Sequence, residues 1–144
     1  MGEELAGGIH RCAAVKCVHV PFMGCLVAAG FPSPAEDCLD RPLDFNELLI
    51  ARPAATFAVR VTGESMRDAG ILPNDIAVID RSITPVNGCI ILAIVDSEFT
   101  IKIFRKRGAR VVLEPANPVF RRIEITDGMS FECWGVVKGV VRVL

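Results

Sequence analysis

Two residues in the middle of the chain, Ser65 and Lys102, are of the types that perform nucleophilic catalysis. Residues 57–62 alternate apolar and polar side chains, which predicts a strand, and Gly63 permits a tight turn just before the serine. A hydroxyl at such a strand end lies beside backbone N–H groups. These groups can hold the oxyanion that forms when serine attacks a carbonyl, and we expect the N–H groups of Ser65 and Met66 to do so.

A serine nucleophile needs a base, and the best candidate is Lys102. The only two histidines, His10 and His19, lie far upstream. Lys102 is the one cation in the otherwise apolar stretch 98–104, and burial there would lower its pKa to ~7–8, where it accepts a proton near neutral pH. From the strand pattern alone, an ordinary lysine on a solvated face is the competing interpretation.

The elements that must position these residues are mostly strands. The hydrophobic pattern predicts strands at 56–62, 76–80, 89–95, 98–104, 109–114 and 131–143. Asp96-Ser97 is expected to form a two-residue hairpin turn. The length of 144 residues is enough for a single core. We therefore predict a compact, mostly β fold with one short helix and an extended N-terminal arm.

The short helix is predicted from a capping pattern. Asp44 would be the N-cap, with Glu47 three residues later. Leu48, Leu49 and Ile50 would then form the apolar face of about two turns, which end before Pro53.

Composition argues against direct nucleic-acid binding. The chain has 16 basic and 17 acidic residues and a net charge of −1, so no direct DNA binding is expected. Aromatic residues are few, which also argues against a platform for stacking bases. The run Arg105-Lys106-Arg107, with Arg110 nearby, is interpreted as a solvated hairpin connection; binding of a partner is the alternative.

The six cysteines show no CxxC pair, so reduced thiols in the cytoplasm are the plain interpretation. One local cluster, His10, Cys12, Cys17 and His19, gathers four metal-ligand types in ten residues, but its spacing is unlike that of zinc knuckles. We expect no metal or organic cofactor. Zinc content by mass spectrometry would test the cluster.

The apolar segment Val18–Gly30 is too short to span a bilayer, so no membrane association is expected. A signal peptide is the alternative, because basic residues precede the segment and Val27-Ala28-Ala29 fits a small-residue cleavage site. Two early glutamates, Glu3 and Glu4, together with His19 and Pro21 argue against export, and a cytoplasmic protein is expected.

Four stretches give the chain a resemblance to the LexA/UmuD family of self-cleaving Ser-Lys peptidases, and to its UmuD branch in particular. They are FPSPAEDCLDRPLDFNELLI (31–50), VTGESMRDAGI (61–71), DSEFTIK (96–102) and WGVVKGVV (134–141). The resemblance covers about residues 24–144. It implies Ser65 as nucleophile, Lys102 as base and a LexA-type peptidase β fold. The expected division is a cleavable arm (1–29), a linker with the short helix (30–55) and a β peptidase domain (56–144).

The resemblance also implies a site of self-cleavage, which we place between Ala29 and Gly30. UmuD-like proteins commonly carry Cys-Gly before the FPSP stretch, and LexA-like relatives cut Ala-Gly bonds. The residue types suit the reaction, because Ala29 is small enough for a narrow pocket and Gly30 lets the backbone approach the nucleophile without a Cβ. From the residues alone, an ordinary small-residue hinge is equally compatible with this stretch.

A role in the SOS response follows from the same resemblance. A RecA–single-stranded DNA filament would promote the cleavage, and the homodimeric product would join a UmuC-type polymerase in error-prone translesion synthesis. The 30 residues before Phe31 are too few for a repressor's DNA-binding domain. A LexA-like phage or plasmid regulator without that domain remains an alternative, as does an interaction module that has lost cleavage.

Overall fold

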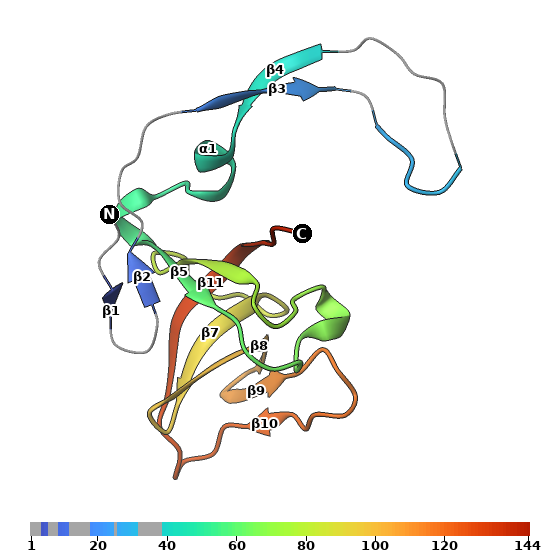
Figure 1. Cartoon of the computed structure of the whole chain (residues 1–144). Helices are drawn as coiled ribbons and strands as arrows, with labels where there is room; N and C mark the ends of the chain where they lie inside the picture. Colours follow the sequence, from blue (N-terminus) through green and yellow to red (C-terminus); the bar gives the residue numbers. More distant parts are fainter. Residues whose placement is uncertain (1–3, 6–8, 12–17, 25, 32–38) are drawn as a thin grey trace.

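The computed structural model describes residues 4–5, 9–11, 18–24, 26–31 and 39–144 (Figure 1). Nine of the eleven strands in the described residues form one antiparallel sheet. In spatial order its strands are β1 (Glu4–Leu5), β2 (Ile9–Arg11), β5 (Thr56–Arg60), β6 (Ile76–Asp80), β11 (Phe131–Val141), β7 (Ile90–Val95), β8 (Glu98–Arg107), β9 (Arg110–Glu114) and β10 (Ile123–Glu124). The prediction of a mostly β fold is confirmed, and each of the six predicted strands is present within a few residues.

The turn between β7 and β8 has the geometry that its two residues predict. Asp96 and Ser97 both have positive φ, 47° and 69°, and Val95 pairs directly with Glu98. Turns with two positive φ values match the right-handed twist of the strands that they join. This turn fixes the register of β8 and therefore the position of Lys102, which lies opposite Ile91.

The centre of the sheet is buried on both faces. Along β7, Leu92 packs in one apolar cluster while its neighbours Ile91 and Ala93 pack in another. The first cluster also includes Val61, Met66 and Ile71 from the segment after β5. The second includes Phe104 from β8 and Leu113 from β9. Because successive side chains of a strand point to opposite faces, β7 joins the two halves of the core.

The segment before β5 holds more regular structure than the sequence predicts. A separate two-stranded ribbon pairs β3 (His19–Met23) with β4 (Leu39–Asp44), and β2 adds to the sheet edge at β5. None of the strands β1 to β4, nor β10, was predicted from the sequence. These strands are short, and β3 contains Pro21 and has all five side chains exposed, so no apolar–polar alternation marks it.

The predicted helix exists but is shorter than expected. α1 spans Phe45–Leu49, and the Asp44 carboxylate accepts a hydrogen bond from the Asn46 N–H at 2.8 Å, as an N-cap does. The predicted two turns are wrong, because Ile50 is already the C-cap. The helix has no buried residue, and Leu48 is 64% exposed, so the expected apolar face does not pack as a unit.

Two short 3-10 turns complete the secondary structure, η1 (Pro53–Ala55) before β5 and η2 (Arg67–Ala69) after the predicted nucleophile. No helix in the described part of the chain has the length and apolar character needed to cross a bilayer. Within the same residues, no three metal-ligand side chains come together. Cys12 and Cys17 lie outside the described residues, so the expectation that the cluster of His10, Cys12, Cys17 and His19 holds no metal stays a prediction.

Candidate active site

Ser65 lies in the segment between β5 and β6, immediately after a left-handed turn. Gly63 adopts φ +78°, a conformation that side chains with a Cβ rarely take. On the far side of the serine, Met66 is buried in the first apolar cluster beside Val61 and Ile71. The buried Met66 therefore anchors the turn, and Ser65 remains partly accessible at the surface.

A second loop, residues 115–118, holds the backbone of the turn that carries Ser65 (residues 63–66, the serine turn). The side-chain amide of Asn117 donates to the Glu64 carbonyl at 2.9 Å, and the Ala116 N–H donates to the Ser65 carbonyl at 2.8 Å. The Asp68 N–H in turn donates to the Ala116 carbonyl at 2.8 Å. Asn117 is only 4% exposed. The stretch Pro115-Ala116-Asn117-Pro118 signals only a turn, so the sequence did not predict this contact.

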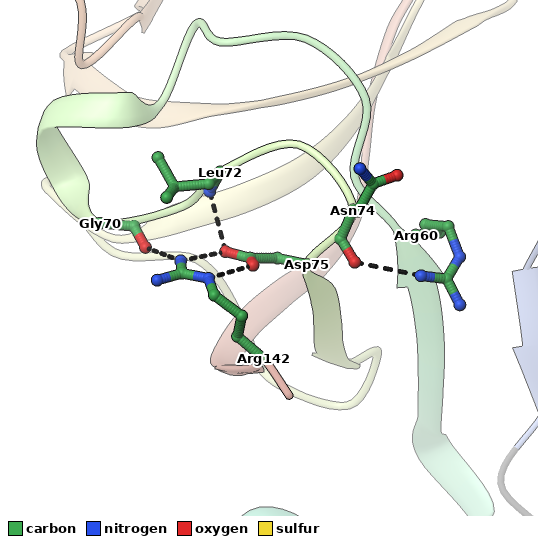
Figure 2. Close-up of polar contacts among 6 residues, drawn as sticks. All are labelled: Arg60, Gly70, Leu72, Asn74, Asp75 and Arg142. Carbon is green, nitrogen blue, oxygen red and sulfur yellow. Dashed lines mark hydrogen bonds and ion pairs between the residues drawn. The ribbon is translucent and has the colours of Figure 1, made fainter. Parts of the chain in front are cut away.

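The end of the segment between β5 and β6 is tied to the residue that follows β11 by a partly buried ion pair (Figure 2). The Asp75 carboxylate accepts from Arg142 Nε at 2.6 Å and Nη2 at 2.5 Å, and it also accepts from the Leu72 N–H at 2.8 Å. Arg142 Nη2 further donates to the Gly70 carbonyl at 2.9 Å. The hydrogen bonds from Arg142 are the main cause of the low pKa of Asp75, about 2.

The structure brings Lys102 and Ser65 into contact. Lys102 Nζ lies 3.0 Å from Ser65 Oγ, 2.6 Å from Thr100 Oγ1 and 3.2 Å from the Ile101 carbonyl. The lysine is 8% exposed, and burial lowers its pKa below the usual value for lysine. An ordinary lysine on a solvated face does not fit this environment. Thr100 had no predicted role, although its position two residues before the lysine places both on one face of β8.

A cleft of about 270 Å³ opens beside these two residues. It is lined by residues 59–63, by Ser65 and Met66, and from the other side by Leu92 and residues 99–101. Within the described part of the chain, no hydrogen bond uses the N–H of Ser65 or Met66. Both predicted oxyanion donors are therefore available to an acceptor in the cleft. The arrangement provides a hydroxyl, a desolvated amine and free N–H groups, the parts that acyl transfer needs.

The predicted scissile bond lies elsewhere. Ala29 and Gly30 sit in an exposed bend, and none of residues 26–31 lines the cleft. In Figure 1 this blue segment lies apart from the sheet, beyond the β3–β4 ribbon. The structure thus brings the two predicted catalytic side chains together and leaves the predicted cleavage site outside.

Comparison with known proteins places the chain in a family. Residues 21–138 match the family described as Peptidase S24-like. The chain is 47% identical over 116 residues to Protein ImpA of Salmonella typhimurium, an alignment that covers 79% of this chain and 77% of that protein. Protein MucA of Escherichia coli is 40% identical over 131 residues, covering 90% and 89%. The LexA repressor of an Azoarcus species is 38% identical over 141 residues, covering 97% of this chain and 67% of the repressor.

Proposed function

Because the chain belongs to the S24-like family of self-cleaving serine peptidases, and to its UmuD type, we propose that Ser65 is its nucleophile and Lys102 its general base. The observation that carries this assignment is the 3.0 Å contact between Lys102 Nζ and Ser65 Oγ. Burial of the lysine supports it, since a lowered pKa provides a neutral amine nearer to physiological pH.

The reaction proceeds by acyl transfer. Neutral Lys102 takes the Ser65 proton while Ser65 Oγ bonds to the carbonyl carbon of residue 29, and the N–H groups of Ser65 and Met66 hold the resulting oxyanion. The protonated lysine then gives its proton to the leaving amine of residue 30. Water releases the acyl group from Ser65, with Lys102 again as the base. Thr100 accepts from Nζ and so directs the amine toward the serine.

The substrate is the chain's own arm, cut between Ala29 and Gly30. In the structure both residues are exposed and outside the cleft, so cleavage requires the arm to enter the cleft of its own chain or of a second copy. Tethering gives the arm a high effective concentration at the cleft. Ala29 adds little bulk beside Ser65, and Gly30 has no Cβ to obstruct the approach.

The cellular role is SOS mutagenesis of the UmuD type. Beyond that, we propose that a RecA–single-stranded DNA filament stimulates the cleavage in the cytoplasm. The product, as a homodimer, would then serve as the accessory subunit of a UmuC-type error-prone polymerase. The similarity to ImpA and MucA over most of their lengths supports this role more than that of a DNA-binding regulator. Light scattering tests the dimer, and co-purification with a UmuC-type polymerase tests the partner.

Substitution of the two side chains tests the dyad. Ser65→Ala and Lys102→Ala should each leave a folded protein whose self-cleavage, followed by intact mass at alkaline pH, falls by about 10³-fold or more. Lys138→Ala is the matched control, because Lys138 is an exposed lysine on β11. Normal processing of either dyad variant would refute the assignment.

The pH dependence tests the role of the lysine separately. Only neutral Lys102 accepts the proton, so the rate should rise with pH through its folded-state pKa and then level off. Since burial lowers that pKa, levelling should begin below the value of an unperturbed lysine, near 10.4. A rate that is flat from neutral to alkaline pH, with the fold intact, would exclude a lysine base.

The position of the cut is read from the product. Incubation with RecA, an ATP analogue and single-stranded DNA should yield a fragment beginning Gly30-Phe31. Ala29→Trp should slow its formation, because the indole would have to fit beside Ser65, and should leave unfolding unchanged. A fragment that starts elsewhere would move the cleavage site without affecting the dyad.

A further inference from the structure

A basic groove lies on the β8–β9 hairpin, on different residues from the Ser65 cleft. It has a volume of about 400 Å³, and five of the eight residues that line it are cations. They are Arg105, Lys106, Arg107, Arg110 and Arg122. Pairing of β8 with β9 places Arg107 opposite Arg110 and Lys106 opposite Val111, so residues separated by the turn meet in one place.

Three of the five cations have no acidic partner in the described part of the chain. Arg105 pairs with Glu114, and Arg110 pairs with Glu124. Lys106, Arg107 and Arg122 are exposed and make no ion pair with any described residue. Like charges held together raise the local potential and favour an anionic ligand. The structure therefore leaves an unneutralised positive site in a protein whose net charge is −1.

The composition of the groove favours a phosphate chain over an acidic protein. Four of the five cations are arginines, whose planar guanidinium matches the oxygens of a phosphate. Val112 is the only apolar lining residue, whereas stable protein interfaces have aromatic or aliphatic anchors at their centre. The absence of an aromatic lining residue also leaves no surface on which bases could stack.

We propose that this groove binds the sugar-phosphate backbone of a nucleic acid. Binding there is independent of base sequence and sensitive to salt, because it consists of phosphate contacts without base contacts. The sequence-based expectation of no direct DNA binding rested on net charge. Net charge averages over the whole surface and does not report a local cluster. The proposal stands apart from the assignment of Ser65 and Lys102.

Fluorescence anisotropy of a labelled oligonucleotide tests the groove. The full chain carrying Ser65→Ala keeps the arm attached during the measurement, and single-stranded and duplex forms of one sequence are titrated in parallel. We expect a dissociation constant of about 10⁻⁴–10⁻⁶ M at physiological salt, with little change when the sequence is altered.

Neutralising the three unpaired cations should weaken this binding. Each phosphate contact to a single strand contributes about 0.7 to the slope of log K against log salt, so the triple variant Lys106→Gln, Arg107→Gln and Arg122→Gln should lower the slope by about 2. Affinity at low salt should fall at least about tenfold. The same triple variant with Ser65 intact should still cleave itself at alkaline pH, which shows that the fold is preserved.

The control is Lys138→Gln, which removes one exposed charge from β11, two strands away from β8. It should leave the slope unchanged. The proposal is overturned if the wild-type groove binds neither form of DNA at low salt, or if Lys138→Gln weakens binding as much as Arg122→Gln does. It is also overturned if a poly-glutamate peptide binds the groove more tightly than the oligonucleotide, since the partner would then be an acidic protein.

Discussion

The β region, residues 56–144, and the described residues of the N-terminal region, 18–50, bury their apolar side chains to very different extents. Leu113 in β9 is fully buried, whereas Leu26 is 98% exposed and the neighbouring Val27 is 83% exposed. The β region holds the proposed nucleophile and base in a network of hydrogen bonds. The N-terminal region holds the proposed scissile bond in an exposed bend. One chain thus combines a well-packed region that holds the proposed nucleophile and base with a weakly packed segment that holds the proposed scissile bond, and such a segment can leave its position at little cost.

The largest expected effect on stability is in the core. Leu113→Ala removes a fully buried side chain from the cluster that joins β7, β8 and β9, and should lower the free energy of unfolding by about 2–5 kcal/mol. Urea denaturation measures it. A loss below about 1 kcal/mol would mean that the core collapses around the cavity, and the contrast between the two regions would be weaker than their burial indicates.

The next largest effect is on the rate of self-cleavage, and it concerns the loop 115–118, which hydrogen-bonds to the backbone of Glu64 and Ser65. Asn117→Ala removes the amide that donates to the Glu64 carbonyl, so Ser65 should shift relative to Lys102 and self-cleavage should slow by about 10–100-fold. Asn117→Asp keeps an oxygen for the Val119 N–H but loses the donor, and should slow cleavage similarly.

A positioning role for Asn117 has its own signature. The rate should fall at every pH while the midpoint of the pH–rate profile stays in place, because Lys102 keeps its surroundings. Asn87→Ala is the matched control, since Asn87 contacts the Lys106 backbone and lies outside the cleft. A shifted midpoint would show that Asn117 acts on the lysine and not on the serine turn.

The hydrogen bond from Asn117 to the Glu64 carbonyl could not be predicted from the sequence. Ser65 follows a predicted strand and a glycine turn, whereas Lys102 was assigned as the base through the resemblance to the LexA/UmuD family, because the strand pattern alone also fits a solvated lysine. Asn117 lies 52 residues beyond Ser65, on a loop whose sequence signals only a turn, and its role depends on how β9 returns to the serine turn. Such long-range pairing depends on the tertiary fold and leaves no local pattern.

The same reasoning explains the errors upstream of β5. Strand prediction worked where one face is buried, because burial selects apolar residues at every second position. β3 and β4 form a ribbon whose described side chains are mostly exposed, so no such selection acts on them. The helix capped by Asp44 was predicted correctly at its start, where the signal is a local hydrogen bond. Its end depends on packing and was predicted incorrectly.

A smaller effect should appear at the Asp75–Arg142 pair. The pKa of Asp75 is about 2 in the folded chain and near 3.9 in the unfolded chain. The ionised Asp75 carboxylate therefore contributes fully to the free energy of unfolding above pH ~4, and this contribution is lost as pH falls through about 2. Arg142→Gln should therefore destabilise the protein at neutral pH, and the difference from wild type should narrow between pH ~4 and ~2.

Unfolding in urea at several pH values measures this difference. Arg105→Gln is the control, because both members of the Arg105–Glu114 pair are substantially exposed and such pairs contribute about 0–1 kcal/mol. A difference for Arg142→Gln that stays constant down to pH ~2 would show that the arginine stabilises the fold through the Gly70 carbonyl and not through the carboxylate.

The smallest effect is expected in the arm, and it bears most directly on the comparison of the two regions. Leu26→Ala deletes the same atoms as Leu113→Ala, but the side chain is already in contact with water, so the free energy of unfolding should change by less than about 0.5 kcal/mol. The same urea experiment, run at several protein concentrations, provides the measurement. A loss above about 1 kcal/mol that grows with protein concentration would mean that a second copy covers the arm in solution. The arm would then have to leave that surface before Ala29 could reach Ser65, and the low cost of moving the substrate would hold only for the monomer.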